Sequence, residues 1–198
     1  MNCGRASFGP PAGSRWFLAG CAGVGGLLLL EGTVRRGGSA SDLHASAEDA
    51  GSTRRIAAAS LLAALGAPLL RRLPVRPLPA LCGPLGLGVI ACGLALRIWS
   101  MQTLAAAYAR TLRVTNEQSV IERGPYRHVR HPGYLGSLLV WAGFALSSRS
   151  AVVVSSVTAL LLPAYKHRMD AEERLLERAL PDYESYEGRT KRLVPGVW

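Results

Sequence analysis

The chain has 198 residues, of which 49% are hydrophobic and 18% are charged, and its formal net charge is +10. Charged residues are therefore scarcer than the usual share of about 25%. The arginines border long apolar blocks and do not form a basic stripe with interleaved aromatic residues, which argues against nucleic-acid binding. Apolar blocks bordered by arginines are typical of an integral membrane protein.

The first half of the chain contains two short apolar runs. Residues 1–14 are rich in Gly, Pro and Ser and are predicted to be disordered. The runs at 16–30 and 56–70, separated by a polar loop over 32–54, hold 15 uncharged residues each. A bilayer core needs ~20 apolar residues, so each run is either a span completed by snorkelling arginines or a re-entrant or interfacial segment.

The second half contains three further apolar segments. Residues 77–96 give 20 uncharged residues, and helical periodicity extends this helix beyond Arg97. Residues 133–147 and 150–165 predict a helical hairpin with a very short turn. From Lys166 the chain is charged, but an apolar face predicts an amphipathic helix that ends near Pro181. That face is formed by Leu175, Leu176, Ala179 and Leu180. The sequence thus predicts an all-α, polytopic membrane protein with about five transmembrane helices, in a single domain over residues 1–198.

The distribution of Lys and Arg predicts the orientation of these spans. Five spans place the N-terminus, the 71–76 turn and Arg149 on one side, with six of the 23 Lys and Arg residues. The other side holds the remaining seventeen and also the C-terminus. Lys and Arg concentrate on the cytoplasmic side of membrane proteins, whereas acidic residues contribute little to orientation. We therefore expect a multi-pass protein whose C-terminus and longer polar loops are cytoplasmic.

The cysteines give no sign of a metal site. The chain has four, Cys3, Cys21, Cys82 and Cys92, and none forms a C-x-x-C pair. The last three lie in apolar runs, where packing is the ordinary role of a thiol. We expect neither a bound metal nor a disulfide framework.

The most distinctive stretch is the segment Gly124–Gly136, which reads GPYRHVRHPGYLG. Pro125 and Pro132 prevent one continuous helix, because each lacks an N–H and restricts the residue before it. The part from 124 to 133, called the RHP loop below, is cationic and runs directly into an apolar segment. It is either a site for an anionic or amphiphilic ligand at the membrane edge or a positively charged loop that only sets topology.

A second candidate feature is the pair Arg168 and Glu172, which are four residues apart on one helix face. One interpretation is a solvated salt bridge worth a few tenths of a kcal/mol. The other is that Arg168 binds a substrate anion while Glu172 binds an ammonium group.

Three motifs in this order resemble the isoprenylcysteine carboxyl methyltransferase family, within the wider group of membrane methyltransferases that includes phospholipid methyltransferases. They are GPYRxxRHPxYxG at 124–136, EExxL at 172–176 and YxxYxxxxxRxxP at 183–195. The resemblance covers about residues 97–198. The first half of the chain is similar only in being hydrophobic, and Leu180-Pro181 stands where the family often has Phe-Gly.

The resemblance implies a five-helix membrane enzyme that uses S-adenosyl-L-methionine, with residues 97–198 as the cofactor-binding catalytic half. Its cytoplasmic C-terminal helix and tail would close the cofactor pocket over the RHP loop. The implied cofactor contacts are Gln118, Ser119, Val120, Ile121, Tyr126, His131, Pro132, Gly133, Tyr134 and Glu172. Glu172 would bind the amino group of the cofactor, and Arg168 would bind the carboxylate of a lipophilic, prenylcysteine-like substrate; both are the expected catalytic residues.

The chemistry of carboxyl methylation agrees with what the motifs contain. A carboxylate is ionised at neutral pH and needs no general base, so in-line methyl transfer requires orientation and desolvation. Neither a Ser-His-Asp arrangement nor a metal site is evident in the sequence. Three alternatives stay open: a phospholipid or other amine N-methyltransferase, a sterol-reductase-like NADPH enzyme, and a non-enzymatic membrane scaffold.

Overall fold

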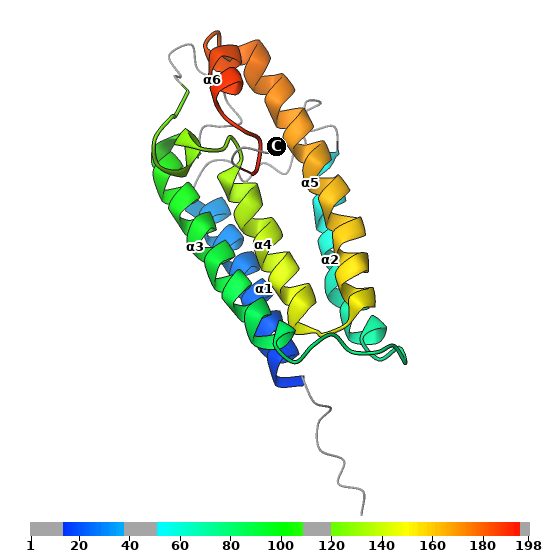
Figure 1. Ribbon diagram of the computed structural model, residues 1–198. Helices are drawn as coiled ribbons and strands as arrows, with labels where there is room; N and C mark the ends of the chain where they lie inside the picture. Colours follow the sequence, from blue (N-terminus) through cyan, green and yellow to red (C-terminus); the bar gives the residue numbers. More distant parts are fainter. Residues whose placement is uncertain (1–13, 38–50, 109–119, 195–198) are drawn as a thin grey trace, which may run out of the picture.

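A computed structural model describes residues 14–37, 51–108 and 120–194. These residues form six α-helices and one short 3-10 helix, and no β-strand occurs among them (Figure 1). The long helices are α1 (Ser14–Gly37), α2 (Ser52–Leu70), α3 (Cys82–Tyr108), α4 (Pro132–Ser147) and α5 (Ala151–Ala179). The 3-10 helix η2 (Gly124–Arg127) and α6 (Tyr183–Arg189) lie at one end of the bundle. The all-α prediction is confirmed.

Several helix bounds differ from those expected. The helix α1 begins at Ser14 and reaches Gly37, and α2 begins at Ser52, so the polar loop between them is shorter than the expected 32–54. The expected helix at 77 begins only at Cys82. The second helix of the predicted hairpin and the amphipathic helix after Lys166 form the single helix α5, which continues through Pro163. Of the segment expected to be disordered, 1–14, Ser14 instead begins α1, and the rest lies outside the described residues.

Close contact between α3 and α4 organises the bundle. A Cβ atom on Gly93 would lie 2.7 Å from the carbonyl oxygen of Gly136, and one on Gly86 would lie 2.5 Å from that of Gly143. Gly93 faces Gly136 and Gly86 faces Gly143, so the two helices are antiparallel. The two glycines on each helix are seven residues apart. Since no side chains intervene, the two backbones approach closely, as small residues allow in membrane helices.

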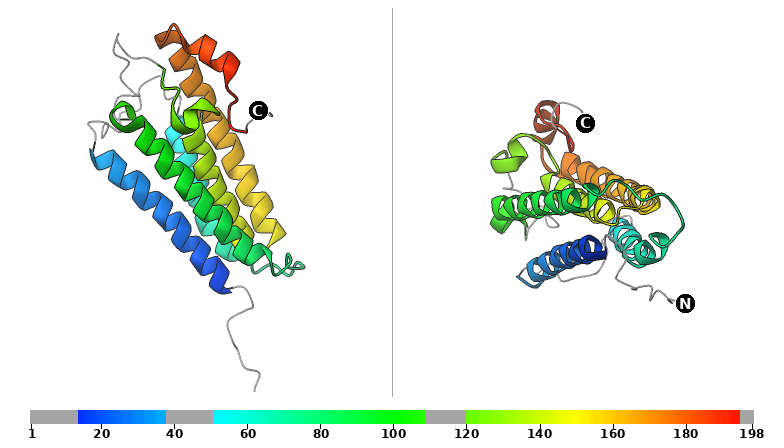
Figure 2. Two further views of the ribbon diagram at one scale, coloured as in Figure 1. Left: turned by 60° about the vertical axis from the view of Figure 1, so that its left-hand side comes forward. Right: turned by 60° about the horizontal axis from the view of Figure 1, so that its bottom comes forward.

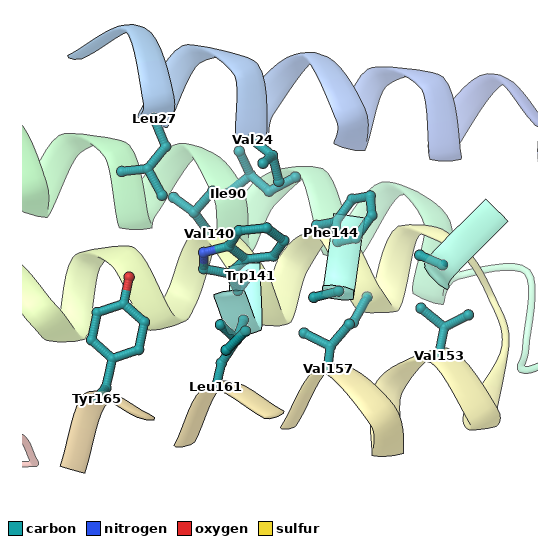
Figure 3. Packing of buried hydrophobic residues seen from close by; sticks show 14 of the residues in the cluster. Val24, Leu27, Ile90, Val140, Trp141, Phe144, Val153, Val157, Leu161 and Tyr165 are labelled. Carbon is teal, nitrogen blue, oxygen red and sulfur yellow. The ribbon is translucent and has the colours of Figure 1, made fainter. Parts of the chain in front are cut away.

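The remaining helices pack around this pair. The helix α1 contacts α3 and α4, and α2 packs beside α5 (Figure 2). The apolar core lies between these layers and includes Val140, Trp141 and Phe144 from α4 with Val153 and Leu161 from α5 (Figure 3). The ring of Trp141 meets that of Phe144 edge-on at 5.7 Å.

The α4–α5 turn is tied to the connection between α2 and α3. Arg149 has a positive φ of 56°, and its Nε and Nη2 donate to the carbonyl of Leu78 at 3.1 and 3.0 Å. The N–H of Leu78 in turn donates to the carbonyl of Arg149 at 2.8 Å. The 71–76 turn and Arg149 therefore lie at the same end of the bundle, as the predicted order of spans requires.

Two of the described helices are long and apolar enough to cross a membrane, over Ser52–Leu70 and Cys82–Leu104. Only 17% and 28% of their most apolar windows are buried, so most of this apolar surface faces outward. The expected number of five spans is not confirmed. The helix α4 has 16 residues, and the apolar parts of α1 and α5 end after about 15, below the ~20 that a bilayer core needs. Which end of the bundle is cytoplasmic stays a prediction.

Candidate active site

The RHP loop owes its shape to its prolines and its first glycine. Gly124 has φ 59°, a conformation that favours glycine, and it precedes Pro125 at the start of η2. Pro132 occupies the first turn of α4, where its missing N–H costs nothing. Between these two helices, Val129 forms an isolated parallel bridge with Lys191.

The C-terminal tail, residues 182–194, folds back onto this loop. The N–H groups of Arg130 and His131 donate to the carbonyls of Lys191 and Arg192 at 2.8 and 3.1 Å. The contact between the tail and the loop, on which the sequence interpretation depended, is therefore present.

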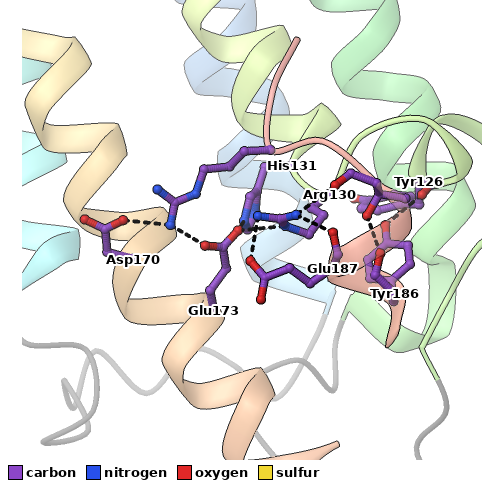
Figure 4. Close-up of polar contacts among 9 residues, drawn as sticks. Tyr126, Arg130, His131, Asp170, Glu173, Tyr186 and Glu187 are labelled. Carbon is purple, nitrogen blue, oxygen red and sulfur yellow. Dashed lines mark hydrogen bonds and ion pairs between the residues drawn. The ribbon is translucent and has the colours of Figure 1, made fainter. Parts of the chain in front are cut away.

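Glu173 is the centre of a polar network that we call the latch (Figure 4). Its Oε1 accepts from Nε of Arg130 at 3.0 Å and lies 2.9 Å from Nε2 of His131. Its Oε2 accepts from Nη2 of Arg192, which also pairs with Asp170 at 2.7 Å. Glu173 is only 4% exposed. One buried carboxylate thus joins α5 to both the RHP loop and the tail.

The network keeps Glu173 ionised. Burial disfavours the charged form, but the hydrogen bonds from His131 and Arg192 and the positive charges around the carboxylate outweigh it. The pKa of Glu173 is therefore held well below its ordinary range.

Further contacts strengthen the attachment of the tail. Arg130 also pairs with Oε1 of Glu187 at 2.8 Å and donates to the carbonyl of Thr190 at 2.8 Å. The hydroxyl of Tyr186 donates to the carbonyl of Tyr126 at 2.7 Å. Burial raises the pKa of Tyr186 to about 12, so its phenol is a neutral donor at physiological pH.

A second cluster lies beside the latch and contains both expected catalytic residues. The hydroxyl of Tyr134 donates to Oε2 of Glu172 at 2.6 Å and accepts from Nε of Arg168 at 3.2 Å. The ring of Tyr134 stacks against that of His131 with centroids 5.5 Å apart. We call Tyr134, Arg168 and Glu172 the site triad. Because Tyr134 connects Arg168 with Glu172, the pair is not a purely solvated salt bridge on one helix face.

The first turn of α4 brings together four of the expected cofactor contacts, His131, Pro132, Gly133 and Tyr134. Beneath Gly133 lies Arg97, whose Nη1 would be 2.8 Å from a Cβ atom there. Arg97 is nearly buried and pairs with Glu31 of α1 at 3.4 Å. Arg97 of α3 thus packs against the start of α4 and pairs with Glu31 of α1.

The other expected contacts are more scattered. The carbonyl of Tyr126 accepts a hydrogen bond from the hydroxyl of Tyr186 in the tail. Val120 packs against the cluster of Leu180, Tyr183 and Tyr186. Ile121 is partly buried. Gln118 and Ser119 lie outside the described residues.

Several residues of the latch lie within the three sequence motifs, but the sequence did not predict their role. Glu173 and Arg192 belong to the EExxL and YxxY motifs, and Arg130 precedes His131, yet spacing alone does not reveal that they meet. Ser52, which contacts Arg168, lies outside all three motifs. Its position follows from the way α2 packs against α5, a long-range relation without a local signal.

A surface hollow lies outside the site triad. A hollow of about 340 Å³ is lined by Glu177, Leu180, Pro181, Glu184 and Glu187, and none of these belongs to the site triad. Within the described ranges, no group of three or more His, Cys, Asp or Glu side chains is arranged to hold a metal ion.

Comparison with known proteins adds to this geometry. Two of the described helices have the length and composition of membrane-spanning helices, and the polar latch lies at one end of the bundle. Residues 85–178 match the sequence model of the isoprenylcysteine carboxyl methyltransferase (ICMT) family. The resemblance drawn from the motifs is thus confirmed for residues 85–178, which include most of α3, all of α4 and nearly all of α5.

One curated relative is the cobalt-zinc-cadmium resistance protein CzcN of Cupriavidus metallidurans, 27% identical over 121 residues. The match covers 61% of this chain and 51% of that protein, so the chain spans about half the length of the relative. No solved structure matches the chain.

Proposed function

We propose that the protein is an integral-membrane methyltransferase that uses S-adenosyl-L-methionine to methylate the carboxylate of a lipophilic, isoprenylcysteine-like acceptor. The observation that carries this proposal is the site triad. It places the Glu172 carboxylate and the Arg168 guanidinium within hydrogen-bonding distance of one phenol, that of Tyr134, at the polar end of an apolar bundle. The match of residues 85–178 to the ICMT family model supports the reaction class.

The residues present fit the cofactor's chemistry. Glu172 is a suitable partner for the ammonium group of an amino acid, because a carboxylate accepts strong charge-assisted hydrogen bonds. When bound, S-adenosyl-L-methionine would supply a sulfonium methyl group for in-line transfer. Tyr126, His131, Pro132, Gly133 and Tyr134 would hold the cofactor, with Val120 and Ile121 beside its nucleoside; Gln118 and Ser119 belong to the same proposed set.

Arg168 is proposed to bind the acceptor. Its planar guanidinium matches a carboxylate bidentately, and its orientation is fixed by Tyr134 on one edge. The acceptor is already ionised at neutral pH, so the protein needs to orient the carboxylate and exclude water from it. The apolar surface of the neighbouring helices suits the lipid part of such an acceptor.

The test is transfer of labelled methyl from S-adenosyl-L-methionine to a farnesylcysteine analogue by detergent-purified protein. We expect a product that releases methanol in base, as an ester does. The variants Arg168→Ala and Glu172→Ala should abolish transfer although both still insert and fold. A base-stable product would instead indicate N-methylation, and oxidation of NADPH would indicate a reductase. Full activity in both variants would overturn the site assignment.

A further inference from the structure

The side chain of Arg168 is held by a part of the chain far from the three motifs. Its Nη1 donates to Oγ of Ser52 at 2.9 Å and lies 3.3 Å from Oγ1 of Thr53. These two residues form the first turn of α2, which begins beside the polar half of α5 (Figure 1). The contact spans 116 residues of sequence, and Ser52 and Thr53 lie outside the family match over 85–178.

Ser52 is completely buried, although it is polar and lies at a helix end. A buried hydroxyl costs free energy unless it is hydrogen-bonded, and here it accepts from a charged donor, which gives a stronger bond than a neutral donor would. The hydroxyl therefore has a defined partner, and that partner is the guanidinium assigned to the acceptor.

The guanidinium of Arg168 is consequently held from two other helices. Nε is bonded to Tyr134 on α4, and Nη1 is bonded to Ser52 and Thr53 on α2. Two fixed edges define the plane of a rigid guanidinium, whereas the aliphatic part of an arginine side chain alone is flexible.

We propose that Ser52 and Thr53 are positioning residues, which set the plane of the Arg168 guanidinium for binding the acceptor carboxylate. This inference rests on the proposed function, because it assigns Arg168 to the acceptor. The N-terminal half of the chain then contributes to the active site and is more than a membrane anchor. Displacement of a binding group by about 1 Å can lower a rate by about 100-fold, so the loss of these hydroxyls should be measurable.

The first experiment compares Ser52→Ala and Thr53→Val with Ser60→Ala, a control two turns further along α2. Initial rates of methyl transfer are measured against both substrates, and binding of S-adenosylhomocysteine is measured by calorimetry. We expect Ser52→Ala to raise the KM for the acceptor about tenfold, Thr53→Val to raise it less, and Ser60→Ala to leave it unchanged. The affinity for S-adenosylhomocysteine should not change in any of the three, which also shows that they fold.

The second experiment asks whether Ser52 acts through Arg168. In an Arg168→Lys background, Ser52→Ala should cause no further rise in the acceptor KM, because lysine lacks the planar fork that the serine orients. A further tenfold rise would overturn the proposal, as would an unchanged KM in Ser52→Ala alone. If the wild-type protein methylates no carboxylate acceptor, the proposed function fails and this inference fails with it. If the wild-type protein methylates the acceptor and Ser52→Ala leaves the acceptor KM unchanged, only this inference fails.

Discussion

Nε2 of His131 lies 2.9 Å from Oε1 of Glu173, and this contact joins the start of α4 to the polar extension of α5. Arg130 and Arg192 reach the same carboxylate from the RHP loop and the tail. The ring of His131 in turn stacks on Tyr134 of the site triad. The latch therefore holds the tail in place and also fixes one edge of the candidate site.

Replacement of the latch carboxylate should destabilise the protein. Glu173→Gln removes the only negative charge that Arg130, His131 and Arg192 share in the latch, and loss of one partner from a buried charge network costs about 3–5 kcal/mol. We expect a lower melting temperature in detergent and weaker binding of S-adenosylhomocysteine. Glu177→Gln, on the exposed side of the same helix, is the control and should change stability by about 0.5 kcal/mol or less. Equal melting temperatures for wild type and Glu173→Gln would contradict the latch.

The same carboxylate predicts how stability depends on pH. Its pKa is lowered in the folded protein, so its contribution is present above the unfolded value, about 4.3, and is lost as pH falls toward the folded value. The difference in melting temperature between wild type and Glu173→Gln should therefore be constant from pH 8 to about pH 5.5. It should shrink below about pH 4. A difference that disappears between pH 7 and pH 6 would show that another group controls the latch.

Much of this arrangement could be predicted from the sequence, because the relevant signals are local. The apolar runs gave the long helices, and Pro132 marked the start of α4. The spacing of Arg168 and Glu172 placed them on one helix face, and the structure brings both to Tyr134.

The parts that escaped prediction are those that depend on long-range packing. Nothing near Glu173 indicates that two arginines and a histidine from two other segments converge on it. Ser52 reaches Arg168 only because α2 packs beside α5. The number of spans could not be settled either, since runs of 15 apolar residues fall between a core helix and a full span.

The glycine contacts between α3 and α4 predict a sharp difference between two similar substitutions. In Gly93→Ala the new Cβ would meet the Gly136 carbonyl oxygen at 2.7 Å, so the helices must separate, at a cost of about 1–3 kcal/mol. Gly88→Ala, on the same helix, meets nothing within 4 Å and should be neutral or slightly stabilising. Thermal unfolding in detergent compares the two. Equal stabilities would contradict the close approach of these backbones.

The hydroxyl of Tyr134 should contribute to methyl transfer independently of its ring. Tyr134→Phe keeps the stack with His131 but removes the group that joins Arg168 to Glu172. Hydrogen bonds to charged groups are worth about 1.5–3 kcal/mol, so kcat/KM should fall by roughly 10- to 100-fold. Steady-state kinetics would measure this, with circular dichroism as the check that the fold is kept. Wild-type kcat/KM in Tyr134→Phe would remove the phenol from the proposed site.

The most direct test of the account is calorimetric titration of the detergent-purified protein with S-adenosylhomocysteine. The account predicts saturable binding with one site per chain. It also predicts that Glu172→Gln loses this binding, whereas Glu177→Gln, five residues further along α5, retains it. Absence of binding to the folded wild-type protein, or equal binding by both variants, would contradict the claim that Glu172, in the site triad beside the latch, holds the methyl donor.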